Sequence, residues 1–95
     1  MKTINFKEFV LSLDVAQKQK QTIDVREVFA NILYARANGI QAHSLAFMIY
    51  KSEGNLEITG DEERIIIAVA QQHTTPAFID GIMAQLNENN LEEKQ

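Results

Sequence analysis

The chain has 95 residues, a mass of 10.8 kDa, one Pro, four Gly, no Cys and a formal net charge of −4. Its 28 Leu, Ile, Val and Phe residues exceed the roughly 20% below which chains stay disordered, so the composition predicts one folded domain over residues 1–95. The absence of Cys excludes disulfides, thiolate nucleophiles and Cys-bearing zinc sites.

Hydrophobic residues recur at spacings of three and four along almost the whole chain, and this period predicts helices. The alternation typical of a strand appears only briefly, around residues 56–58. The first predicted helix begins near Asn5, because Glu8 completes a capping box and Ile4 and Phe9 occupy the positions of a hydrophobic staple. We expect the polar stretch 17–22 to prolong this helix or to link it to the next one.

The second predicted helix starts with the same signal, since Asp24 is followed three residues later by Glu27. It ends at Asn38-Gly39, where Gly supplies the left-handed residue that commonly terminates a helix. A third helix is expected from about Gln41 to Ser52.

Two further helix starts lie in the second half of the chain. Thr59 and Glu62 form another capping signature, which predicts a fourth helix over about 60–72. Thr75 then caps a fifth helix with Pro76 in its first turn, and the polar tail from about residue 88 is expected to fray. The sequence therefore predicts an all-α fold: a compact five-helix single domain with a helix-turn-helix-like hairpin in the middle.

That central hairpin carries the strongest motif. Ala35, Gly39 and Leu45 follow the spacing of a helix-turn-helix, in which a small residue allows close helix crossing, and Ile40, Leu45 and Met48 are expected to lock the second helix onto the first. The segment resembles the helix-turn-helix of small bacterial and phage regulators. The resemblance implies a DNA-binding transcriptional regulator, with candidate DNA contacts at Arg36, Gln41, His43 and Lys51.

The same hairpin also favours protein binding, because Phe47 and Tyr50 give its second helix an apolar outward face. Either residue could instead face the other helices. The leading prediction is a non-catalytic helical protein-interaction module, an adaptor, inhibitor or regulator typical of a bacterial or phage accessory protein; the DNA-binding regulator is the alternative. The candidate protein-binding residues are Phe47, Ile49, Tyr50, Glu62, Glu63 and Ile66.

Charge is divided unevenly along the chain. Residues 1–40 carry six basic and four acidic side chains, whereas residues 41–95 carry three and nine. The acidic half favours a basic partner over nucleic acid, unless its carboxylates serve only as capping and solubilising charges. A small positive patch is expected if the first two helices pack together, formed by Lys7, Lys18, Lys20, Arg26 and Arg36.

No enzyme constellation is present in the sequence. His43 and His73 are the only histidines, no two-His spacing on one helix indicates a metal, and no glycine loop cradles phosphate. The longest apolar run, 65–70, is far too short to span a bilayer. We therefore expect a cytoplasmic protein without cofactor, metal or membrane contact, whose partner is another protein or a second copy of itself.

Overall fold

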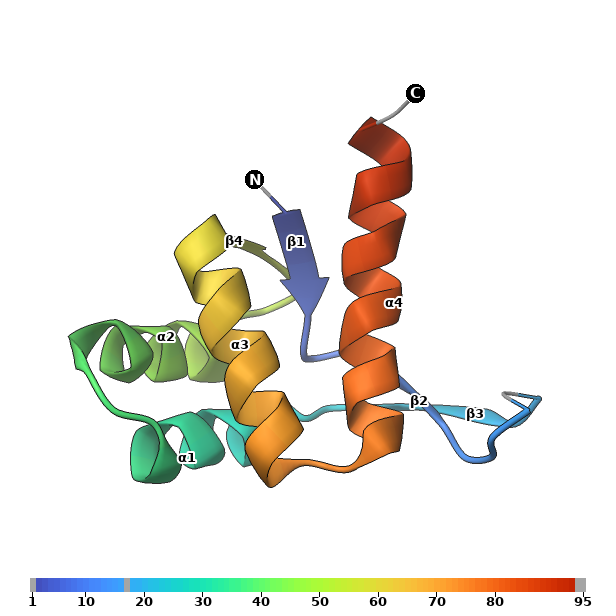
Figure 1. Cartoon of the computed structure of the whole chain (residues 1–95), viewed down its shortest axis with the longest axis horizontal. Coiled ribbons are helices and arrows are strands. Elements are labelled where there is room, and N and C mark those ends of the chain that lie inside the picture. Colours follow the sequence, from blue (N-terminus) through green and yellow to red (C-terminus); the bar gives the residue numbers. More distant parts are fainter. Residues whose placement is uncertain (1, 17, 94–95) are drawn as a thin grey trace.

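The computed structural model describes residues 2–16 and 18–93, with side chains described as far as Asn87. The described residues form four helices and two small antiparallel sheets (Figure 1). In chain order the elements are β1 (Lys2–Asn5), β2 (Phe9–Ser12), β3 (Lys20–Ile23), α1 (Arg26–Arg36), α2 (Ile40–Lys51), β4 (Asn55–Ile58), α3 (Gly60–His73) and α4 (Pro76–Glu93).

The predicted all-α five-helix fold is wrong, because the described residues include two small antiparallel sheets and the first predicted helix, expected from near Asn5, is replaced by a turn and β2. The Asn5 side chain accepts hydrogen bonds from the backbone N–H groups of Lys7 at 3.0 Å and Glu8 at 2.8 Å. An Asn side chain makes such bonds in a turn as readily as at a helix N-cap, so the capping signal was ambiguous. The residues of the expected staple, Ile4 and Phe9, are both fully buried.

Strand β1 pairs with β4, far along the chain, in the register Lys2↔Ile58 to Asn5↔Asn55. The brief alternation around 56–58 therefore marked a real strand. Gln85 of α4 closes the end of β1: its Oε1 accepts from the Asn5 N–H at 2.7 Å and its Nε2 donates to the Asn5 carbonyl at 3.2 Å. Strand β4 and Gln85 thus supply hydrogen-bond partners for the backbone of β1.

The described part of the polar stretch after β2, residues 18–22, is not helical. Residues 20–23 form β3, which pairs antiparallel with β2 in the register Phe9↔Ile23 to Ser12↔Lys20. In Figure 1 this hairpin projects from the side of the molecule opposite α1 and α2. Its base is held by α4, which packs on both β1 and β2.

The other four predicted helices exist close to their expected bounds. Before α3, Thr59 accepts from the Glu62 N–H at 3.2 Å and the Glu62 side chain accepts from the Thr59 N–H at 2.8 Å, which is the expected capping box. Gly39 has the expected positive φ of 102°, although it caps the start of α2 and does not end α1. Helix α4 continues through Glu93; residues 94–95 lie outside the described residues, and fraying from about residue 88 stays a prediction.

The core is organised around four phenylalanines from four different elements. Phe6 stacks on Phe29 with ring centroids 5.2 Å apart, and Phe9 stacks on Phe78 at 4.6 Å. Phe29 and Phe78, 5.5 Å apart, join the two pairs. The turn between β1 and β2, the start of the hairpin, α1 and α4 thereby meet in a single apolar cluster, which fixes the hairpin relative to the helices.

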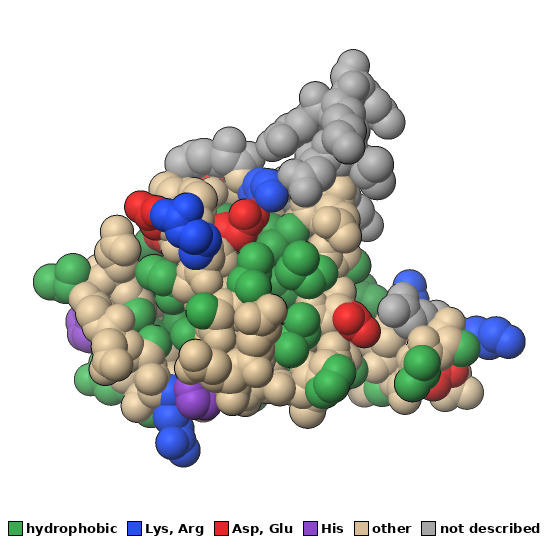
Figure 2. Space-filling view, in the orientation of Figure 1, with side chains coloured by type: hydrophobic (Ala, Val, Ile, Leu, Met, Phe, Trp, Pro, Cys, Tyr) green, Lys and Arg blue, Asp and Glu red, His purple; other side chains and the backbone are tan. Residues whose placement is uncertain are grey.

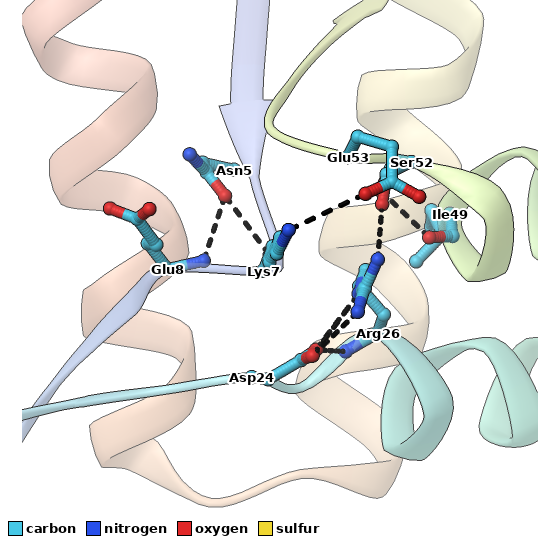
Figure 3. A network of polar contacts seen from close by, with 8 residues as sticks. All are labelled: Asn5, Lys7, Glu8, Asp24, Arg26, Ile49, Ser52 and Glu53. Atoms are coloured by element: carbon cyan, nitrogen blue, oxygen red, sulfur yellow. Dashed lines mark hydrogen bonds and ion pairs between the residues drawn. The ribbon is translucent and has the colours of Figure 1, made fainter.

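A polar network ties the start of α1 to the end of α2 (Figure 3). Arg26 Nη2 lies 2.8 Å from Asp24 Oδ2, while Arg26 Nη1 donates to the Ser52 carbonyl at 2.6 Å. This carbonyl belongs to the C-cap of α2, where a cation is favourable to the helix dipole. Lys7 adds a longer ion pair to Glu53 at 3.4 Å. The network therefore fixes one end of the α1–α2 pair.

We expect the contribution of this network to the free energy of unfolding to decrease at acid pH. The Arg26 side chain, followed by the Arg26 backbone N–H, donates hydrogen bonds that lower the pKa of Asp24 from its ordinary 3.8. The Asp24–Arg26 pair therefore stabilises the fold fully at pH values above the ordinary pKa of Asp24. This stabilisation is lost as the pH falls through the lowered pKa. Denaturant unfolding from about pH 5 to about pH 2 should therefore show the advantage of wild type over Asp24→Asn shrinking. Arg26→Gln should remove the same dependence, and a constant difference between wild type and Asp24→Asn would contradict the role of the pair.

Candidate protein-binding groove

The outer face of the α1–α2 pair contains a hollow of about 300 Å³. Two small side chains, Ala30 of α1 and Ala46 of α2, form its floor and are each only 4% exposed. These two small side chains, one from each helix, leave space between the larger residues that line the hollow. The remaining lining residues are Glu27, Asn31, Tyr34, Phe47 and Tyr50, and we call the whole site the aromatic groove.

Three rings hold one another in place at one end of the aromatic groove. Tyr34 of α1 lies edge-on to Phe47 of α2, with ring centroids 6.0 Å apart. His43, one helical turn before Phe47, lies 5.0 Å from Phe47 and 5.7 Å from Tyr34. Contacts between rings from both helices restrict their rotamers, so the apolar wall is preorganised.

Apolar exposure is concentrated on this helix pair. Ten large hydrophobic side chains are exposed among the described residues, and six of them belong to α1 and α2. Contiguous exposed apolar surface commonly marks an interaction site, and three of these side chains, Tyr34, Phe47 and Tyr50, line the aromatic groove together. The six residues are Val28, Tyr34, Ile40, Phe47, Met48 and Tyr50.

The structure divides the predicted protein-binding residues into two groups. Phe47 is 46% exposed and Tyr50 is 56% exposed, and both line the aromatic groove. Ile49 and Ile66 were wrongly predicted as contacts, because both are fully buried in the core. The inward stripe of α2 is 42, 45, 46 and 49, so Ile49 points away from the face that carries Phe47 and Tyr50.

The two predicted acidic contacts make bonds within the chain. The Glu62 carboxylate completes the capping box of α3, and Glu63 Oε1 lies 2.8 Å from Lys2 Nζ of β1. Neither residue lines the aromatic groove. Charge reversal at these positions would therefore disturb α3 and its contact with β1 as well as any partner.

The residues of the DNA-binding alternative are all on the surface, but the motif around them packs differently from the expected one. Arg36, Gln41, His43 and Lys51 are exposed, and His43 belongs to the ring cluster. Of the three residues expected to lock the second helix, Leu45 is buried, whereas Ile40 is 82% and Met48 38% exposed. Ala35, expected at the helix crossing, is also exposed.

Sequence reasoning missed the α1 side of the site. Glu27, Ala30, Asn31 and Tyr34 lie at spacings of three and four, which is a helical stripe mixing polar and apolar residues. A search for purely apolar stripes passes over such a pattern.

The expected positive patch is broken up as well, because Lys7 and Arg26 are engaged with Glu53 and Asp24.

No protein-family model, curated protein or solved structure matches this chain. Within the described ranges, no group of three or more His, Cys, Asp or Glu residues is placed to hold a metal ion. No described helix combines the length and apolar character that a membrane crossing needs.

Proposed function

We propose that this chain is a non-catalytic protein-interaction module that binds apolar side chains of a partner in the aromatic groove. The observation that carries the proposal is the exposed wall of Tyr34, Phe47 and Tyr50 around a floor of two alanines, in which ring contacts hold Tyr34 and Phe47 in place. Aromatic residues around a small pocket are typical of the centres of protein interfaces, where they contribute most of the binding energy.

The polar rim of the aromatic groove supports the same proposal. Glu27 and Asn31 lie beside the apolar walls, and the tyrosine hydroxyls can donate hydrogen bonds to a partner backbone. An apolar centre with a polar rim is the usual anatomy of a protein interface.

The proposal includes a cytoplasmic location, since a chain without Cys needs no oxidising compartment.

DNA binding has less support as a second candidate. Two exposed aliphatic side chains, Ile40 and Met48, and the aromatic Phe47 lie on the helix that would enter the major groove. Such side chains offer no hydrogen bonds to base edges and no charge to phosphate.

Selection of random displayed peptides on the wild-type protein tests the proposal. The selected peptides should bind Phe47→Ser/Tyr50→Ser about tenfold or more weakly, because each substitution removes an aromatic anchor. Met83→Ser is the matched control, since Met83 is a 37% exposed apolar residue on α4, outside the aromatic groove. Binding should be unchanged in this control.

Two results would contradict protein binding at this site. One is a selection that yields no peptide, or only peptides insensitive to the double substitution. The other is tight uptake of a mixed-sequence DNA duplex at low salt that is lost in Arg36→Ala/Lys51→Ala, which would favour the regulator alternative.

A further inference from the structure

A second unpartnered apolar surface lies at the end of the β2–β3 hairpin. Val15 is 101% exposed and Leu13 is 55% exposed. We call residues 9–16 with 18–23 the arm and residues 13–16 with 18–19 its tip. Hydrophobic side chains lie beside acidic and basic ones at the end of this projection (Figure 2). Folding within one copy leaves these aliphatic groups in water.

Hydrogen bonds join the described residues of the tip to one another. The Leu13 N–H donates to the Gln19 carbonyl at 2.8 Å, which continues the hairpin beyond its paired strands. Asp14 Oδ1 accepts from the backbone N–H groups of Lys18 at 3.0 Å and Gln19 at 3.3 Å. Because local hydrogen bonds fix the turn, presenting Leu13 and Val15 to a partner costs little conformational entropy.

The arm and the aromatic groove lie at opposite ends of the molecule. Figure 1 is viewed with the longest axis horizontal, and α1 and α2 lie at one end of it while the arm projects at the other. The molecule extends 37 Å along this axis. The arm of one copy therefore cannot reach the aromatic groove of the same copy, and any contact between them joins two molecules.

The two surfaces are complementary in chemistry. Leu13 and Val15 are exposed aliphatic groups, and the aromatic groove offers a hollow of about 300 Å³ beside aromatic side chains; among the described residues that line it, Glu27 is the charged one. Neither Glu27 nor Lys18 has an ion-pair partner among the described residues. An unpaired amine on the tip thus matches an unpaired carboxylate on the rim.

We propose that the arm of one copy docks in the aromatic groove of a second copy, with Leu13 and Val15 against Phe47 and Tyr50 and with Lys18 near Glu27. The inference rests on the proposed function and names its partner as a second copy of this chain. The contact is heterologous, so each copy offers one arm and one groove. Such a contact generates rings if its rotation closes and filaments if it does not.

Complementation between two variants tests this contact. Leu13→Asp/Val15→Asp removes the arm, and Phe47→Ser/Tyr50→Ser removes the groove; all four residues are exposed, so both variants should fold, as circular dichroism can verify. Light scattering coupled to size exclusion should give wild-type masses that rise with concentration and monomeric masses for each variant. An equimolar mixture of the variants should give a dimer and nothing larger, because only one intact arm and one intact groove remain.

A charge exchange provides an independent measurement. Lys18→Glu and Glu27→Lys should each weaken association by about two- to fivefold, and combining them in one chain should restore it. Met83→Ser should leave association unchanged.

Several outcomes would overturn the contact. A mixture that stays monomeric would do so, as would dimers that persist without the arm but not without the groove, which indicate a symmetric groove-to-groove interface. A wild type that is monomeric at every concentration yet binds selected peptides through Phe47 and Tyr50 would refute self-docking and leave the proposed function standing.

Discussion

Replacing Phe29 by Ala should lower the free energy of unfolding by about 3 to 5 kcal/mol, the range for truncating a buried Phe. Phe29 is fully buried and its ring stacks on both Phe6 and Phe78. The substitution therefore opens a cavity where α1, α4 and the turn after β1 meet. A small domain has only about 5 to 15 kcal/mol of stability in total, so a large part of it should be lost.

Phe47→Ala is the matched control for this prediction. The same atoms are removed from a residue that is 46% exposed, so the free energy of unfolding should change by about 1 kcal/mol or less. Chemical denaturation followed by circular dichroism measures both variants. Equal losses would mean that Phe47 also belongs to the core and would remove the basis for the aromatic groove.

Replacing Gly81 by Ala should destabilise the fold by about 1 to 3 kcal/mol, although Ala is the better helix former. A Cβ at this position would lie 2.7 Å from the Phe9 ring and 2.8 Å from the Val10 carbonyl oxygen. The Val10 oxygen is part of the β2 backbone and cannot rotate away as a flexible side chain would. The base of the arm would have to move off α4, at a cost larger than the gain in helix propensity.

Gly60→Ala serves as the control, because no atom lies within 4 Å of a Cβ at Gly60. Its effect should stay within about 0.5 kcal/mol. Thermal or denaturant unfolding compares the two, and amide chemical shifts of β2 should move only in Gly81→Ala. If Gly81→Ala is as stable as wild type, the close approach of β2 to α4 does not constrain the fold.

At Gly81 the element that packs closely against α4 is strand β2. The sequence shows that a glycine lies within a helix at this position. It does not show which element packs against that glycine. Phe29 and Phe47 illustrate the same limit of local sequence. Both are phenylalanines in helices, and whether each is buried or exposed depends on which element packs against its helix.

The sequence by itself determined the helices from α1 to α4, the capping box before α3 and the positive φ of Gly39. These features depend on residues within one or two helical turns, so their signals are local. It also named Phe47 and Tyr50 as candidates for an outward face, although only the structure shows that both are exposed. The candidate site was thus partly visible before any fold was known.

Only the tertiary structure decided the first quarter of the chain and the shape of the site. Near Asn5, the same hydrogen-bonding side chain suits a helix start or a turn, and the choice depended on β4, more than 50 residues away, and on Gln85 of α4. The aromatic groove likewise needs Ala30 and Ala46 opposite each other on two helices. Strand pairing and concave surfaces arise from contacts between distant segments, and local sequence patterns do not encode which segments will meet.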